Sequence, residues 1–161
     1  MTLEPWPNDL AVVPGEVIGW RAWRVVVRRE PQLMSLFYDI VWPTDDWLAA
    51  ETMYVGQEEP HGICAARDRE HLAGMHQYFD PSAPRYVENW GREFAAIGEV
   101  GLSGKIIPGE RGYRAEKARV LSIVLPYAAW ELVEPLRRAY RVPVSLANIL
   151  TKTGGLRGHR A

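Results

Sequence analysis

An alternating stretch in the second half of the chain, Gly98–Leu125, constrains the fold more than any other feature. Its first part places Val100, Leu102 and Ile106 on one side of an extended chain, with polar residues between them. A period of two is typical of a strand that is buried on one face only. We therefore predict a β-strand here, with its apolar face turned toward the core.

A turn and a second extended run follow this strand. Pro108 and Gly109, and then Gly112, supply the residue types that tight turns prefer. The chain then continues to the apolar run Val120–Leu125, so the sequence predicts a β-hairpin in which Gly109 or Gly112 has a positive φ. Three glycines in the first strand indicate a β-bulge or a close backbone neighbour: Gly98, Gly101 and Gly104.

Length and composition indicate a single globular domain. The chain has 161 residues, of which 47% are hydrophobic and 24% charged, and its formal net charge is −1. That charge argues against a general electrostatic capture of nucleic acid or of an anionic membrane. The single cysteine excludes an internal disulfide, and neither a signal peptide nor a membrane-spanning run is recognisable, so we expect a cytoplasmic protein.

The remaining patterns predict an α+β domain over residues 1–150, built on a mainly antiparallel, twisted sheet that includes the central hairpin. Further strands are expected at Trp20–Val27, Leu33–Trp42 and Trp47–Val55. Residues 1–16 carry three prolines and are expected to form an irregular arm. Residues 151–161 are basic and rich in glycine, so a disordered tail is expected there.

Two to three helices are expected to pack against this sheet. Residues 67–79 have helical spacing, and residues 85–97 carry aromatic side chains four positions apart. Pro126 suits the first position of another helix, which Pro135 should kink or split. The apolar stripe of that last helix comprises Trp130, Val133, Leu136 and Tyr140.

Several of these segments together resemble a group of small hypothetical proteins from actinobacteria and their phages. The resemblance rests on Gly19–Val25, Gly62–Ala65, Gly98–Val100 and Gly112–Glu116, and it covers about residues 18–145. It implies a fold and an actinobacterial or phage host, and it implies no activity. Similar proteins often carry histidine and cysteines in the loop before Gly62, but this chain has no cysteine there.

No catalytic or metal-binding pattern is complete. A Cys64 thiolate would need an imidazole beside it, whereas His61 lies three positions away in an extended segment and would face the opposite side. We therefore expect Cys64 to be a buried, unreactive residue. His71 and His76 are five positions apart and do not converge on a metal, and the glycines around Lys105 lack the spacing of a phosphate-binding loop.

The function that the sequence favours is that of a small non-enzymatic protein that binds a protein partner from a host or a phage, without metal or cofactor. The resemblance implies that the chain itself is encoded by a phage or derived from a prophage. Nucleic-acid binding through arginine and aromatic side chains, with Arg28 also contributing, is the alternative. An enzyme that uses Cys64 as a nucleophile is a third hypothesis. The oligomeric state stays open. The candidate binding residues are Trp20, Arg21, Arg24, Arg111, Tyr113, Arg114 and Glu116.

Overall fold

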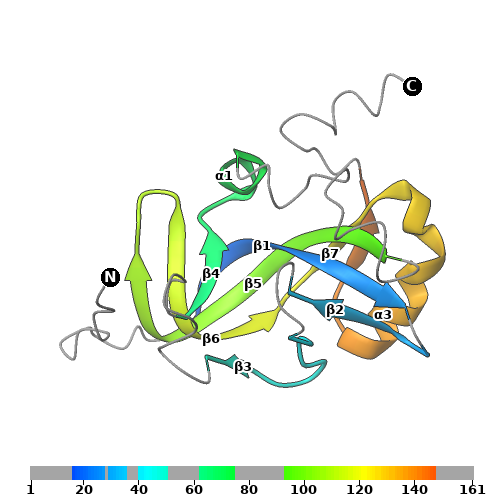
Figure 1. The fold of residues 1–161 in the computed structure, drawn as a ribbon, viewed down its shortest axis with the longest axis horizontal. Helices are drawn as coiled ribbons and strands as arrows, with labels where there is room; N and C mark the ends of the chain where they lie inside the picture. The colour runs from blue at the N-terminus through cyan, green and yellow to red at the C-terminus, as the bar shows by residue number, and fades with distance from the viewer. Residues whose placement is uncertain (1–15, 28, 36–39, 51–61, 75–92, 148–161) are drawn as a thin grey trace.

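A computed structural model describes residues 16–27, 29–35, 40–50, 62–74 and 93–147 (Figure 1). Strands dominate this part of the chain, and nearly all of them pair antiparallel; β7 and β8 form a parallel pair. The elements in chain order are β1 (Val17–Val27), β2 (Pro31–Met34), β3 (Leu48–Ala49), β4 (Ile63–Ala66), α1 (Arg69–Gly74), β5 (Glu93–Pro108), β6 (Gly112–Val120), β7 (Ile123–Leu125), the 3-10 helix η2 (Tyr127–Leu132), α3 (Val133–Tyr140) and β8 (Val144–Leu146).

The predicted hairpin is formed by β5 and β6, and its turn lies between Pro108 and Gly112. The register shifts between the pairs Ser103↔Lys117 and Ile106↔Ala115, so β5 holds one extra residue there. Gly104 lies in this bulge with φ 78°, which confirms the expected bulge. The prediction of a positive φ at Gly109 or Gly112 is wrong, because the bulge inside the strand rather than the turn needs the left-handed residue.

The sheet closes on itself around β5. This strand pairs with β1 along one edge and with β6 along the other, and β4 pairs with both β6 and β1. Four strands therefore form a closed circuit, which leaves fewer free strand edges than an open sheet has. The antiparallel, strand-dominated character agrees with the sequence, whereas the closure was not predicted.

One predicted strand differs from the structure, and a second is described only in part. The strand expected at Leu33–Trp42 ends at Met34, and the chain then reverses, since Trp42 N donates a hydrogen bond to Leu33 O at 2.9 Å. This reversal buries both Leu33 and Trp42 in one cluster, which a single straight strand would not do. Of the strand expected at Trp47–Val55, the structure describes only Leu48–Ala49 as a strand, and residues 51–61 lie outside the described residues.

The helix expected at residues 85–97 is wrong at its C-terminal end. Residues 93–97 belong to β5 and pair with β1, because a long ladder of backbone hydrogen bonds outweighs a four-residue aromatic spacing. Residues 85–92 lie outside the described residues, as do residues 1–15, 75–79 and 151–161 of the predicted arm, helix and tail. Within the expected helix 67–79, the structure describes α1 at Arg69–Gly74.

The C-terminal helix is split as predicted. A 3-10 turn, η2, runs into α3 with non-helical dihedral angles at Ala129, and Pro135 lies in the first turn of α3, where its missing N–H costs no helical hydrogen bond. Leu136 and Tyr140 of the predicted stripe are buried. Trp130 is 63% exposed, so its predicted place in the buried stripe is wrong. Ala129 and Leu132 occupy the buried face of η2 instead.

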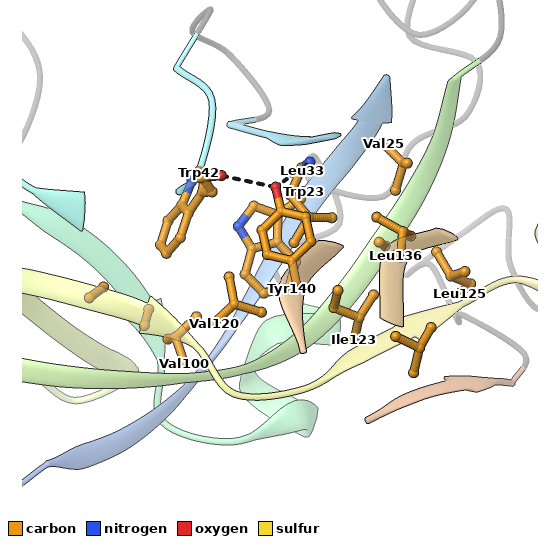
Figure 2. Packing of buried hydrophobic residues seen from close by; sticks show 14 of the residues in the cluster. Trp23, Val25, Leu33, Trp42, Val100, Val120, Ile123, Leu125, Leu136 and Tyr140 are labelled. Carbon is orange, nitrogen blue, oxygen red and sulfur yellow. Dashed lines mark hydrogen bonds between the residues drawn. The ribbon is translucent and has the colours of Figure 1, made fainter. Parts of the chain in front are cut away.

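The Tyr140 hydroxyl joins three separate parts of the chain inside the core (Figure 2). It accepts a hydrogen bond from Leu33 N at 2.9 Å and donates one to Trp42 O at 2.9 Å. Burial raises the pKa of this hydroxyl above its ordinary value of 10.0, so it keeps its proton at neutral pH. The bond therefore fixes α3 against both β2 and the reversed segment after it.

Replacing Tyr140→Phe should destabilise the protein by about 1–3 kcal/mol, because it leaves a buried N–H and a buried carbonyl without partners. The free energy of unfolding from urea denaturation measures this change. Tyr127→Phe is the matched control, since Tyr127 is 59% exposed and its change should stay within about 0.5 kcal/mol. Equal effects of the two substitutions would contradict the role assigned to the Tyr140 hydroxyl.

Candidate binding pocket

A pocket of about 370 Å³ opens where β1 and β4 meet, between α1 and the tip of the β5–β6 hairpin. Its volume lies in the range of small ligand-binding pockets. Its lining consists of Trp20, Arg21, Ala22, Cys64, Ala65, Ala66, Leu72, Ile107, Pro108, Gly109, Arg111, Gly112, Tyr113 and Arg114.

The strand register explains why the surface is hollow at this point. Ala66 lies opposite both Trp20 of β1 and Gly112 of β6, and directly opposed residues point to the same face of a sheet. The row runs from Trp20 through Ala66 to Gly112. The indole projects far from the sheet, whereas the methyl group of Ala66 and the bare backbone of Gly112 do not, so a hollow forms beside the indole. Leu72 of α1 adds an apolar wall. The floor is therefore apolar, and it is recessed because Ala66 and Gly112 are small.

A second row of side chains borders this floor. Arg114 lies opposite Cys64 of β4 on one side and Ile107 of β5 on the other. Both Arg111 and Arg114 are exposed, and within the described part of the chain neither side chain makes an ion pair or a hydrogen bond. The rim of an apolar floor thus carries two arginines that form no ion pair in the described residues, with the exposed Glu110 as the acidic neighbour of Arg111 in the chain.

Two further arginines hold the pocket together. The Arg67 side chain donates from Nη2 to Gly109 O at 2.6 Å and lies 5.2 Å from the centre of the Tyr113 ring, so it clamps the hairpin tip to β4. Arg69 lies 6.0 Å from the centre of the Trp20 ring, at the outer limit of a cation–π contact. Both aromatic rings in the pocket lining, Trp20 and Tyr113, therefore lie near a guanidinium.

Asp68 caps the start of α1 and so positions the wall of the pocket. Its Oδ1 accepts a hydrogen bond from His71 N at 2.8 Å, and Nδ1 of the same histidine contacts that oxygen at 2.8 Å. The hydrogen bond from the His71 backbone, followed by that from its ring, lowers the pKa of the Asp68 carboxyl below its ordinary value of 3.8.

Five of the seven predicted binding residues line this one pocket: Trp20, Arg21, Arg111, Tyr113 and Arg114. Arg24 does not, because it is only 2% exposed and donates from Nε to Ser35 O at 2.8 Å. Glu116 is half-buried beside Gly104 in the bulge. The prediction missed Leu72, Ala22 and Ala66, whose small or apolar side chains give no signal of a site in the sequence.

Cys64 differs from its prediction. Its side chain is half-buried rather than buried, and it lines the pocket. The β4 strand turns Ile63 and Ala65 toward the main core, so Cys64 between them must face the opposite side. His71 is the one histidine in the described residues, and Asp68 engages it, so no thiolate–imidazole pair is found there.

The residues described by the structure contain no group of three or more His, Cys, Asp or Glu side chains suited to a metal ion. Within the same ranges, no helix has the length and apolarity needed to cross a membrane. No family model, curated protein or solved structure matches this chain.

Gly112→Ala should destabilise the protein by about 1–3 kcal/mol, because overpacking forces the backbone apart. A Cβ atom at position 112 would collide with Ala65 O and lie 3.0 Å from Ala66 Cα. Gly109→Ala is the matched control, since a Cβ there meets only Gly112 O, at 3.4 Å. Urea denaturation of both variants measures the difference, and a Gly112→Ala protein as stable as the Gly109→Ala protein would contradict the close approach of β4 and β6.

The Asp68 cap should fail in acid. A carboxyl whose folded-state pKa is lowered contributes stability above its ordinary pKa, and this contribution is lost as the pH falls through the folded-state value. The backbone amide resonance of His71 should therefore shift with a midpoint below 3.8 in an NMR titration. Asp68→Asn retains a capping oxygen without the ionisable group and should show no such titration. A wild-type midpoint above 3.8 would show that the cap is not formed.

Proposed function

We propose that this chain is a non-enzymatic binding protein that takes up an acidic segment of a protein partner through the pocket between β1, β4 and the hairpin tip. The observation that carries the proposal is the unpaired rim: exposed Arg111 and Arg114 beside an apolar floor, in a chain whose net charge is −1. Two positive charges without an ionic partner in the described residues thus lie at the edge of an apolar floor.

The partner's chemistry follows from the two parts of the pocket. A floor formed by Ala22, Ala66 and Leu72 offers apolar contacts to one aliphatic or aromatic side chain. Carboxylates that flank this side chain would pair with the guanidinium groups of the rim, in charge-assisted hydrogen bonds. The apolar anchor supplies affinity, while the arginines select acidic neighbours and orient the segment.

The strands that line the pocket belong to the closed sheet, and the hairpin tip is fixed to it. The Arg67 clamp and the β4–β6 pairing hold the hairpin tip before any ligand arrives. A preformed site of this kind loses little conformational entropy on binding. The resemblance to small actinobacterial and phage proteins implies that the partner is encoded by the host or by the phage.

Single-stranded nucleic acid is the second candidate ligand. It is favoured by Trp20, a half-buried indole at the pocket wall, and by Arg69 beside it, because bases stack on aromatic rings while arginines contact phosphates. The affinity of such a complex would fall steeply with salt concentration, in proportion to the number of phosphates contacted.

Fluorescence polarisation with three labelled probes tests these proposals. The probes are a synthetic acidic peptide with one central tryptophan, the same peptide with alanine in place of that tryptophan, and an oligothymidylate strand. We expect the tryptophan peptide to bind best. The double variant Arg111→Ala/Arg114→Ala should lower its affinity by about tenfold or more while stability stays within about 0.5 kcal/mol.

Arg137→Ala/Arg138→Ala is the matched control, since both arginines are exposed but lie on α3, away from the pocket. It should leave the affinity for the peptide unchanged. Equal losses of peptide affinity in the two double variants would show that the net charge of the protein, and not the pocket, determines binding. That result would contradict the proposed site. Strong binding of the oligothymidylate, without binding of either peptide, would replace the protein partner with nucleic acid.

A further inference from the structure

The 3-10 helix η2 presents two aromatic side chains to the solvent. Tyr127 is 59% and Trp130 63% exposed, whereas Ala129 and Leu132 on the other side of the helix are buried. Both rings therefore lie on the solvent side of η2. Glu131 is exposed next to them. We call this surface, formed by Tyr127, Trp130 and Glu131, the η2 aromatic patch.

Arginine–aromatic contacts are a recurring form of packing in this chain. Guanidinium groups lie within 6.0 Å of ring centres in four pairs of described residues: Arg21–Trp42, Arg67–Tyr113, Arg69–Trp20 and Arg119–Trp47. The η2 aromatic patch has the aromatic half of such a contact at its surface. The pocket rim has the other half, in Arg111 and Arg114, whose side chains make no ion pair in the described part of the chain.

The two surfaces are also complementary in charge. An indole face is negative at its centre, and the Glu131 carboxylate beside it adds a negative group. Both are attracted to the guanidinium groups of the rim, while the apolar edge of the indole suits a floor made of alanine and leucine side chains. Trp130 with Glu131 therefore has the chemistry that the pocket requires, an apolar anchor followed by an acid.

Their positions rule out a contact within one molecule. The hairpin tip lies at one end of the sheet, and the helical segment that contains η2 lies at the other end (Figure 1). A patch and a pocket at opposite ends of a rigid sheet can meet only between two copies of the chain.

We propose that the η2 aromatic patch of one copy binds the pocket of the next copy, with Trp130 on the floor and Glu131 toward Arg114. The proposal rests on the proposed function, because it names a second copy of this chain as an occupant of the same pocket. The interface is heterologous, so each added copy leaves one patch and one pocket open and the assembly grows head to tail. Because one aromatic anchor buries a small area, the association is weak and concentration-dependent.

Sedimentation velocity on the full chain from about 10 µM to about 1 mM covers the range of weak association and tests the proposal. The weight-average mass of the wild type should rise with concentration beyond that of a dimer. Trp130→Ala and Arg111→Ala/Arg114→Ala proteins should each remain monomeric, because each lacks one of the two surfaces. Arg137→Ala/Arg138→Ala is the control, and this protein should associate as the wild type does.

A mixture of the two monomeric variants provides the decisive measurement. The Trp130→Ala protein keeps its pocket and the arginine variant keeps its patch, so an equimolar mixture should form a dimer and nothing larger. A patch that paired with itself would make the arginine variant dimerise without the Trp130→Ala protein, and that result would overturn the proposal, as would a mixture that stays monomeric. A wild type that stays monomeric throughout the concentration range would overturn it as well.

The Trp130→Ala protein also separates this inference from the proposed function. It should bind the acidic tryptophan peptide as tightly as the wild type or more tightly, because no second copy competes for the pocket. If it binds the peptide while the wild type does not associate, the self-association proposal is wrong and the proposed function stands. If the wild type associates and the two variants dimerise when mixed, but neither the wild type nor the Trp130→Ala protein binds the peptide, the pocket is specific for a second copy. The proposed external partner is then wrong.

Discussion

The antiparallel ladder between β1 and β5 supports the rest of the molecule. It runs without interruption from the pair Val17↔Leu102 to the pair Val26↔Glu93. Residues such as Trp23 and Val25 face the main core on one side of this ladder, and Ala22 faces a smaller apolar cluster on the other. Because β1 is apolar on both faces, it must be covered on both, and the pocket opens at the border of the smaller cluster.

The length of β5 lets one strand serve two partners on its other edge. Its C-terminal half pairs with β6, and its N-terminal half pairs with β7 through Ile97↔Val124. Bulges absorb the change of direction: Gly104 takes a positive φ at one, and at the other Leu121 N and Ser122 N both donate to Glu99 O. Gly98 has no side chain because a Cβ atom would collide with Ser122 O. The curvature that closes the sheet thus depends on glycine at defined positions.

Arginine has three distinct roles in this fold, and they separate structure from candidate function. Arg24 is buried and bonded to a carbonyl, so it is part of the core. Arg67 links the hairpin tip to β4 and keeps the pocket in shape. Arg114 stands at the rim with no ionic partner in the part of the chain that is described. A guanidinium is always charged, so its role depends on which groups surround it in the folded chain.

Local patterns in the sequence determined the hairpin, the bulge within its first strand, the β1 strand and the split of the C-terminal helix. Each depends on neighbours in the chain: alternation in Val100 to Ile106, glycine spacing, and the prolines at 126 and 135. These signals act within a few residues, so no tertiary contact was needed to recognise them. The aromatic and basic residues of β1 and the hairpin were likewise visible as candidates, although the sequence could not say that Arg24 is buried while Arg21 and Arg114 share a pocket.

The tertiary structure alone decided the closure of the sheet, the reversal after Met34, and the conversion of residues 93–97 from an expected helix into strand. It alone also decided that Trp130 faces the solvent and that Cys64 borders a pocket. In each case the outcome depends on partners tens of residues away, such as Ala66 opposite Trp20 or Tyr140 beneath Leu33. The physical reason is that burial and strand pairing are set by the whole packed chain, and long-range contacts of this kind override local propensity.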